Sequence, residues 1–126
     1  MRKKLVETLI KKGITNKDVL TAIGEVKRHW FMDSGFIDHA YVDKAFPIGA
    51  DQTISQPFTV GMQTQLLQIE KGEKVLEVGT GSGYQAAVLL EMGAKVFTIE
   101  RQKELYTKVR AAAKYCPNNV ITLIED

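Results

Sequence analysis

Cysteine is scarce in this sequence, and long apolar runs are absent. A single cysteine among 126 residues excludes an internal disulfide and a cysteine-rich zinc site, and is typical of a reducing compartment. No apolar run approaches the roughly 18 residues that a membrane span needs. The basic start is followed by Glu7 and by Lys11 and Lys12 rather than by the apolar core of a signal peptide. We therefore expect a cytoplasmic protein without a membrane partner.

The chain also lacks an excess of charge of one sign. Its 17 Lys and Arg against 15 Asp and Glu give a net charge of +2, whereas nucleic-acid partners usually require a clustered basic excess. His29 and His39 share no metal-ligand spacing with a cysteine or a carboxylate cluster. We expect neither a nucleic-acid partner nor a bound metal. The length and the 44% of hydrophobic residues are ordinary for one globular domain.

Apolar residues at helical spacing predict two helices near the start of the chain. The first contains Leu5–Ile10 and ends at Gly13, and the second continues to Val26. Thr15, which is followed by Asp18, resembles a capping box with a shorter acid. The pattern therefore places the beginning of the second helix at Thr15.

The stretch from about Trp30 to Ile54 has no hydrophobic period but contains many aromatic residues. We interpret it as a long ordered loop with at most a short strand, and loops of that length inside a compact domain are usually functional or disordered. Its aromatic content favours function. Pro57 then suits the first turn of a third helix. The predicted buried face of that helix consists of Phe58, Met62, Leu66 and Ile69.

Strands and helices alternate from Lys74 onward. The predicted strands are residues 75–78, 95–99 and 120–124, and the predicted helices are residues 84–92 and 102–114. Near-continuous apolar strands in this alternation predict a parallel sheet that is covered on both faces. Right-handed crossovers give the strand order 3-2-1. We divide the chain into N-terminal helices with a loop, residues 1–56, and the first half of a Rossmann-like domain, residues 57–126.

A glycine-rich loop, Gly79–Gly83, joins the first predicted strand to its helix. Glycines allow the tight turn and the close approach of a ligand, and the helix N-terminus offers N–H groups. Glu100 ends the second strand, where an acid can accept hydrogen bonds from ribose hydroxyls, and Glu77 precedes the glycines. The spacing G-x-G-x-G differs from the G-x-G-x-x-G of dinucleotide folds. The pattern indicates an adenosine-containing cofactor, and its alternative is a tight turn with a solvated Glu100.

Two segments resemble known families. Val75–Gly83, VLEVGTGSG, resembles motif I of the class I S-adenosylmethionine-dependent methyltransferases. Ala45–Phe58, AFPIGADQTISQPF, resembles the signature of the protein-L-isoaspartate O-methyltransferases, and VKRHWF (26–31) and AYVD (40–43) fit the same family. The resemblance implies an α/β, Rossmann-like methyltransferase fold of three αβα layers with an N-terminal helical segment. It also implies S-adenosyl-L-methionine as the cofactor and S-adenosyl-L-homocysteine as the product.

The resemblance further implies roles for individual residues. Ser55 corresponds to the active-site serine, and the implied substrate is the free α-carboxylate of an isoaspartyl residue in a damaged protein or peptide. The residues implied for cofactor binding are Gln52, Thr53, Ile54, Val60, Glu77, Gly79, Thr80, Gly81, Ser82, Gly83, Glu100, Arg101 and Asp126. No metal belongs to this set.

The expected role of Ser55 follows from the chemistry of the substrate. A carboxylate with a pKa near ~3.7 is ionised at neutral pH and needs no strong general base. We therefore expect Ser55 to orient the substrate by hydrogen bonding rather than to form a covalent intermediate. From spacing alone, Ser55 is favoured as the N-cap of the helix that begins near Pro57, and the two roles are compatible.

The implied activity is methyl transfer to the isoaspartyl carboxylate, which initiates protein repair. The alternatives are a class I methyltransferase with another acceptor, such as a small molecule or RNA, and a truncated cofactor-binding fragment without activity. The first predicted strand would have an open edge where a doubly wound sheet normally continues. We therefore expect the N-terminal part of a longer enzyme, with the C-terminal half of the sheet absent. The full-length enzyme is expected to be a monomer, whereas the open edge of a fragment invites pairing with another chain.

Overall fold

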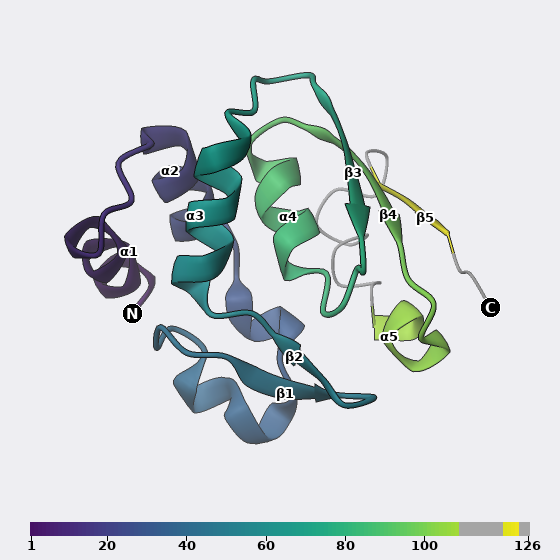
Figure 1. Cartoon of the computed structure of the whole chain (residues 1–126). Coiled ribbons are helices and arrows are strands. Elements are labelled where there is room, and N and C mark those ends of the chain that lie inside the picture. Colours follow the sequence, from purple (N-terminus) through teal and green to yellow (C-terminus); the bar gives the residue numbers. More distant parts are fainter. Residues whose placement is uncertain (109–119, 124–126) are drawn as a thin grey trace.

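A computed structural model describes residues 1–108 and 120–123 (Figure 1). Two helices, α1 (Arg2–Lys11) and α2 (Lys17–Glu25), precede a long connection to α3 (Pro57–Leu67). Helix α1 packs against α2, and α2 packs against α3. The apolar side chains predicted for the first two helices, Leu5, Leu9, Val19 and Ile23, are buried between them.

Helix α2 begins one residue later than its sequence pattern predicts. Asn16 is the N-cap, and its Oδ1 accepts hydrogen bonds from the backbone N–H of Asp18 (2.9 Å) and Val19 (3.2 Å). The backbone N–H of Thr15 instead donates to Gln65 Oε1 of α3 at 2.8 Å. The predicted capping box at Thr15 is therefore wrong, because a contact between helices uses this residue and leaves the cap to its neighbour.

The connection between α2 and α3 contains more structure than a loop. It consists of two short 3₁₀ helices, η1 (Arg28–Phe31) and η2 (Ser34–His39), and an antiparallel hairpin of β1 (Phe46–Gly49) and β2 (Gln52–Ile54). Elements this short carry no readable hydrophobic period, which explains why the sequence pattern indicated a loop. The aromatic residues fix the connection in place; for example, the rings of Phe36 and Phe46 are 5.4 Å apart.

The buried face of α3 differs from the predicted one. Its buried residues include Val60, Gly61 and Thr64, whereas Leu66 is 72% exposed. A Cβ atom added at Gly61 would lie 3.3 Å from Ile23 Cδ1. The absence of a side chain at Gly61 therefore allows α3 to approach α2 closely. Of the predicted face, Phe58, Met62 and Ile69 are half-buried and pack against the core.

A parallel three-stranded sheet forms the second half of the described chain. Its strands are β3 (Lys74–Val78), β4 (Lys95–Ile99) and β5 (Val120–Leu123), in the order β3-β4-β5. Helix α4 (Tyr84–Glu91) follows β3 and packs against β4, and α5 (Lys103–Lys108) follows β4. The three predicted strands, their parallel pairing and their 3-2-1 order are confirmed, except that the predicted end of the third strand at residue 124 lies outside the described residues. The remainder of the helix predicted to reach residue 114 lies outside the described residues.

Strand β3 forms one edge of this sheet in the part of the chain that the structure describes (Figure 1). Leu76 and Val78 are 62% and 79% exposed. The prediction that the strands are covered on both faces is therefore wrong for β3. On the same face of β4, Phe97 and Ile99 are half-buried, whereas Val96 and Thr98 on the opposite face are buried.

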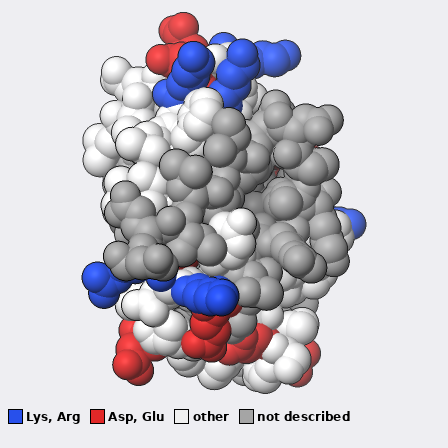
Figure 2. All heavy atoms as spheres, turned by 90° about the vertical axis from the view of Figure 1, so that its right-hand side faces the viewer, with Lys and Arg blue, Asp and Glu red and all other residues white. Residues whose placement is uncertain are grey.

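Charges of both signs lie on the face of the molecule where α5 and β5 lie in Figure 1. Figure 2 shows basic and acidic side chains gathered toward the top and the bottom of this face. No helix within the described ranges is long and apolar enough to cross a membrane.

Candidate functional site

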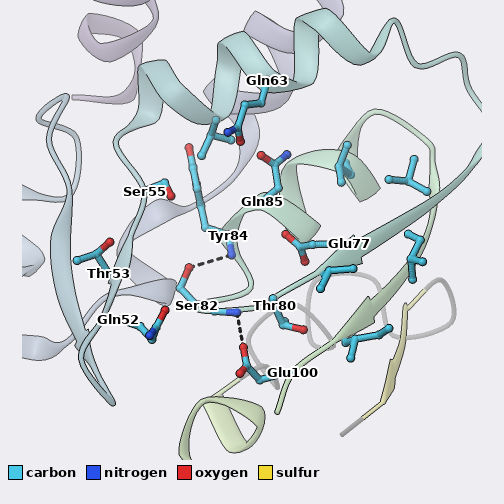
Figure 3. Close-up of a pocket in the computed structure, with 18 of the residues that line it drawn as sticks. Gln52, Thr53, Ser55, Gln63, Glu77, Thr80, Ser82, Tyr84, Gln85 and Glu100 are labelled. Carbon is cyan, nitrogen blue, oxygen red and sulfur yellow. Dashed lines mark hydrogen bonds between the residues drawn. The ribbon is translucent and has the colours of Figure 1, made fainter. Parts of the chain in front are cut away.

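A pocket of about 960 Å³ opens between the β1–β2 hairpin, α3, β3 and the loop that precedes α4 (Figure 3). Its volume falls within the range of roughly 300–1,000 Å³ that is common for small-molecule sites. Thr53 and Ser55 lie on the hairpin side, and Glu77 lies on the side of the sheet. The pocket therefore brings together segments that are far apart in the sequence.

The glycine loop forms the floor of the pocket beside Glu100. Gly79, Gly81 and Gly83 have φ angles of 90°, 58° and 88°, which favour glycine over residues with a Cβ atom. The backbone N–H of Gly79 donates to the carbonyl of Ile99 at 2.8 Å, so the loop is attached to the end of β4. An added Cβ at Gly79 or Gly81 would meet no atom within 4 Å. Space for a ligand therefore lies directly over these glycines.

Glu100 holds the glycine loop through one carboxylate oxygen and the chain after β4 through the other. Oε1 accepts a hydrogen bond from the backbone N–H of Gly81, and Oε2 accepts one from that of Gln102, each at 2.8 Å. The residue is only 5% exposed, yet it lines the pocket. Because each carboxylate oxygen has a second acceptor position, Glu100 can also accept hydrogen bonds from ligand hydroxyls.

Glu77 is a second carboxylate in the pocket, and it lies in a less polar setting. Thr98 Oγ1 donates to Glu77 Oε1 at 2.7 Å, and Thr98 also contacts Thr80 Oγ1. Burial raises the pKa of Glu77 to about 7; the hydrogen bond from Thr98 opposes this effect, and the negative charge of Glu100 adds to it. A cationic ligand group near Glu77 would favour the ionised carboxylate.

The β1–β2 hairpin supplies the opposite wall of the pocket. Its turn contains Ala50 and Asp51 at φ angles of 50° and 56°, in the left-handed region that non-glycine residues rarely adopt. Gln52 and Thr53 follow the turn and line the pocket, whereas Ile54 is 1% exposed and packs into the core. The hairpin is therefore anchored by Ile54 and presents polar side chains to the cavity.

Ser55 lies between the hairpin and α3, with an exposed side chain that faces the pocket (Figure 3). The N-cap position of α3 belongs to Gln56, which makes no side-chain capping hydrogen bond. Asp43, which lies outside the helix, caps the first turn of α3 instead: its Oδ1 accepts a hydrogen bond from the backbone N–H of Phe58 at 2.8 Å. The predicted N-cap role of Ser55 is therefore wrong, and its hydroxyl makes no hydrogen bond to any described residue.

Asp43 is held in this capping position by two further contacts. Its Oδ2 accepts a hydrogen bond from Gln56 Nε2 at 3.2 Å and forms an ion pair with Lys12. Burial alone would raise the pKa of Asp43, but the hydrogen bonds from Lys12, Phe58 and Gln56 outweigh it and lower the pKa. Asp43 is consequently ionised at neutral pH and suited to the positive end of α3.

Most of the residues predicted for the site line this one pocket. They are Gln52, Thr53, Ser55, Val60, Glu77, Gly79, Thr80, Gly81, Ser82, Glu100 and Arg101. Ile54 and Gly83 are not part of the lining; Ile54 anchors the hairpin, and Gly83 is the N-cap residue of α4. Asp126 lies outside the described residues. In the ranges 1–108 and 120–123, no group of three His, Cys, Asp or Glu residues could hold a metal ion.

The pocket lining also contains residues that the sequence patterns did not single out, among them Tyr84, Gln85 and Gln63. Tyr84 and Gln85 directly follow the glycine loop, and Gln63 projects from α3. Gln85 Nε2 donates to Thr64 Oγ1 at 2.9 Å, which joins α4 to α3 across the back of the pocket. Tyr84 and Gln85 are predictable as pocket residues from their position immediately after the glycine loop, whereas no local sequence feature distinguishes Gln63.

The sequence model of the family described as protein-L-isoaspartate(D-aspartate) O-methyltransferase matches residues 1–126. The chain belongs to this family. A protein-L-isoaspartate O-methyltransferase of Christiangramia forsetii is 68% identical over 110 residues, which cover 87% of this chain and 52% of that relative. The corresponding protein of Flavobacterium psychrophilum is 60% identical over 108 residues, which cover 86% and 51%. The chain thus spans about half the length of the curated relatives it matches.

Solved structures share the fold of this chain. One protein-L-isoaspartate O-methyltransferase superposes on 100% of this chain and 42% of its own chain, with a TM-score of 0.86 and 27% sequence identity. A second, from Plasmodium falciparum and solved in complex with S-adenosyl-L-homocysteine, covers 99% of this chain and 62% of its own, with a TM-score of 0.78 and 23% identity. The α/β, Rossmann-like fold class and the family resemblance predicted from the sequence are both confirmed.

Proposed function

We propose that this chain contributes the cofactor loop and the substrate-orienting serine to a repair methyltransferase. The reaction is methyl transfer from S-adenosyl-L-methionine to the free α-carboxylate of L-isoaspartyl residues in damaged proteins. The observation that carries this proposal is that Ser55 and residues 79–82 of the glycine loop line the same pocket. The family match over residues 1–126 supports the same reaction.

The chemistry of the pocket suits S-adenosyl-L-methionine. The space over Gly79 and Gly81 can admit a ligand close to the backbone. Glu100 retains acceptor positions for ribose hydroxyls, and the carboxylate of Glu77 suits the cationic groups of the cofactor. When bound, the cofactor supplies a methyl group that is activated on a sulfonium. The P. falciparum relative, which was solved with the corresponding product, is consistent with this choice.

Ser55 would act on the acceptor side of the reaction. Its exposed hydroxyl is not engaged by other described residues, so it can donate a hydrogen bond to the α-carboxylate of the substrate. That carboxylate is already ionised near neutral pH, so the residues of the pocket need to align it rather than deprotonate it. Alignment of two reactants can lower a barrier by about 7–11 kcal/mol. We propose that no metal is required, because the acceptor is already anionic and the methyl donor already activated.

The test compares two synthetic peptides that differ only in whether one residue is L-isoaspartyl or L-aspartyl. With labelled S-adenosyl-L-methionine, methyl groups should be transferred to the isoaspartyl peptide and not to its aspartyl twin. Transfer to both peptides, or to RNA or a small molecule instead, would overturn the proposed substrate. Binding of S-adenosyl-L-homocysteine without any transfer would favour the alternative of a cofactor-binding fragment.

Two further properties belong to this proposal. We propose a cytoplasmic location, which the single cysteine supports, and cell fractionation tests it. We also propose that the 126-residue chain self-associates through the edge of β3, whereas the full-length enzyme is a monomer. Light scattering of both proteins tests this difference.

A further inference from the structure

Arg28 is fully buried behind the pocket wall and contacts the segment that contains Ser55. Its side-chain Nη2 donates hydrogen bonds to the backbone carbonyls of Ser55 (3.0 Å) and Lys44 (3.1 Å). The guanidinium carbon lies 4.7 Å from the centre of the Tyr84 ring, and Tyr84 lines the pocket. One buried side chain therefore joins the chain before the hairpin, the residue after it, and the pocket wall.

The environment of Arg28 is an unfavourable one for a cation. Among the side chains that the structure describes, Arg28 forms no ion pair, and Asp43 pairs with Lys12 instead. Burial lowers the pKa of the Arg28 guanidinium, and interactions with Tyr84 and Asp43 only partly oppose this effect. An apolar side chain of similar volume would fill this space without the desolvation cost of a buried charge. Packing alone therefore does not explain an arginine at this position.

Two side chains hold the backbone at Ser55 and the residues that follow it, whereas the Ser55 hydroxyl is left available. Arg28 holds the Ser55 carbonyl, and Asp43 holds the side chain of Gln56 and the backbone N–H of Phe58. Fixing the main chain of a residue restricts the directions in which its hydroxyl can point, and catalytic alignment is sensitive to shifts of about 1 Å. The contacts of Arg28 thus act on the orientation of Ser55 rather than on a ligand directly.

We propose that Arg28 is a positioning residue, which orients the Ser55 hydroxyl toward the substrate carboxylate by holding the backbone carbonyl of Ser55. This inference rests on the proposed function, because it takes Ser55 as the residue that binds the isoaspartyl carboxylate. Arg28 itself touches neither substrate nor cofactor in this role. It acts through two carbonyl groups that only a long donor side chain can reach from this buried site.

The experiment uses two variants of the 126-residue chain and one control. Arg28→Met removes the donors and the charge but keeps an unbranched apolar side chain, and Arg28→Lys keeps the charge but loses the planar fork of donors. Ile23→Val, a small change in the buried core of α2, controls for general loosening of the fold. Each protein is examined by thermal unfolding, by amide hydrogen exchange over residues 52–58, and by calorimetric titration with S-adenosyl-L-homocysteine and with the two peptides.

We expect Arg28→Met to unfold at a temperature close to that of the wild type, because removal of a buried charge offsets the loss of two carbonyl partners. Exchange over residues 52–58 should accelerate, and affinity for the isoaspartyl peptide should fall by about tenfold or more. Affinity for S-adenosyl-L-homocysteine should stay within about twofold of the wild type. Arg28→Lys should recover part of the peptide affinity, since an ammonium group can donate to one of the carbonyls.

Unchanged exchange over residues 52–58 in Arg28→Met, or unchanged affinity for the isoaspartyl peptide, would overturn the inference. If Arg28→Met does not fold, Arg28→Lys decides: wild-type peptide affinity together with a lowered unfolding temperature would assign Arg28 a purely structural role. If the wild type itself does not distinguish the two peptides, the proposed function fails. In that case the exchange measurement still shows whether Arg28 fixes the Ser55 segment.

Discussion

Replacement of Glu77 by glutamine should make the protein more stable at alkaline pH. Glu77 carries a pKa raised to about 7 from an ordinary 4.5, chiefly because it is buried. The folded state therefore binds its proton more tightly than the unfolded state does. The stability due to the protonated form is fully present below about pH 4.5 and is lost as the pH rises through about 7. Glu77→Gln removes this loss and keeps an Oε1 acceptor for Thr98.

The magnitude follows from the two pKa values. A difference of about 2.5 units corresponds to about 3 kcal/mol once the carboxylate is fully ionised in both states. Between about pH 5.5 and pH 8.5, the wild type should lose about 2 kcal/mol of unfolding free energy through this one group. Glu77→Gln should not show that loss, so its advantage over the wild type should grow by about 2 kcal/mol across the same interval.

Urea unfolding followed by circular dichroism at these two pH values measures the difference. Glu7→Gln, which changes an exposed glutamate on α1, serves as the matched control and should retain the pH dependence of the wild type. Parallel pH profiles for Glu77→Gln and the wild type would refute the reasoning, because they would show that Glu77 binds no extra proton in the folded state. A Glu77→Gln variant that is less stable than the wild type at pH 8.5 would refute it as well.

Three further substitutions test the site. Asp43→Ala removes the hydrogen bond by which Asp43 caps α3 at Phe58, and it should lower the unfolding free energy at neutral pH by about 2 kcal/mol in urea titrations. The pKa of Asp43 is lowered in the folded state, so the stability that its carboxylate contributes is lost only as the pH falls. The difference in unfolding free energy between the variant and the wild type should therefore shrink near pH 3. Gly81→Ala should cost about 1–2 kcal/mol of stability because the φ angle of Gly81 is 58°. Calorimetry should also show weaker binding of S-adenosyl-L-homocysteine to this variant. The control Gly35→Ala changes a glycine that has open space around it and no positive φ, and it should leave binding unchanged. Ser55→Ala should change the unfolding free energy by less than about 0.5 kcal/mol. It should reduce the affinity for the isoaspartyl peptide by about 10–150-fold in calorimetric titrations. A stability loss of about 1 kcal/mol would instead indicate that Ser55 caps α3.

The parts of the fold that depend on local sequence were predictable. The strands β3 and β4, the glycine loop and the beginning of α4 follow from short apolar runs and from glycines that allow positive φ angles. Glu100 was predictable because it ends a strand next to that loop. These features are determined by residues that are close together in the chain.

Features that depend on contacts between distant segments were not predictable. Thr15 is a residue type that often caps helices, but its backbone N–H donates to the side chain of Gln65, and Asn16 is the N-cap of α2 instead. Likewise, Ser55 precedes α3 in sequence, yet the helix is capped by Asp43 from another segment. In both cases a tertiary hydrogen bond outweighs a local preference.

The most direct test of the account is a calorimetric titration of the 126-residue chain with S-adenosyl-L-homocysteine. The central claim is that the hairpin with Ser55, the glycine loop and Glu100 form one cofactor pocket within this chain. We expect saturable binding of one equivalent, which Gly81→Ala weakens and Gly35→Ala does not. Absence of binding by a folded wild-type chain, or equal binding by both glycine variants, would contradict it.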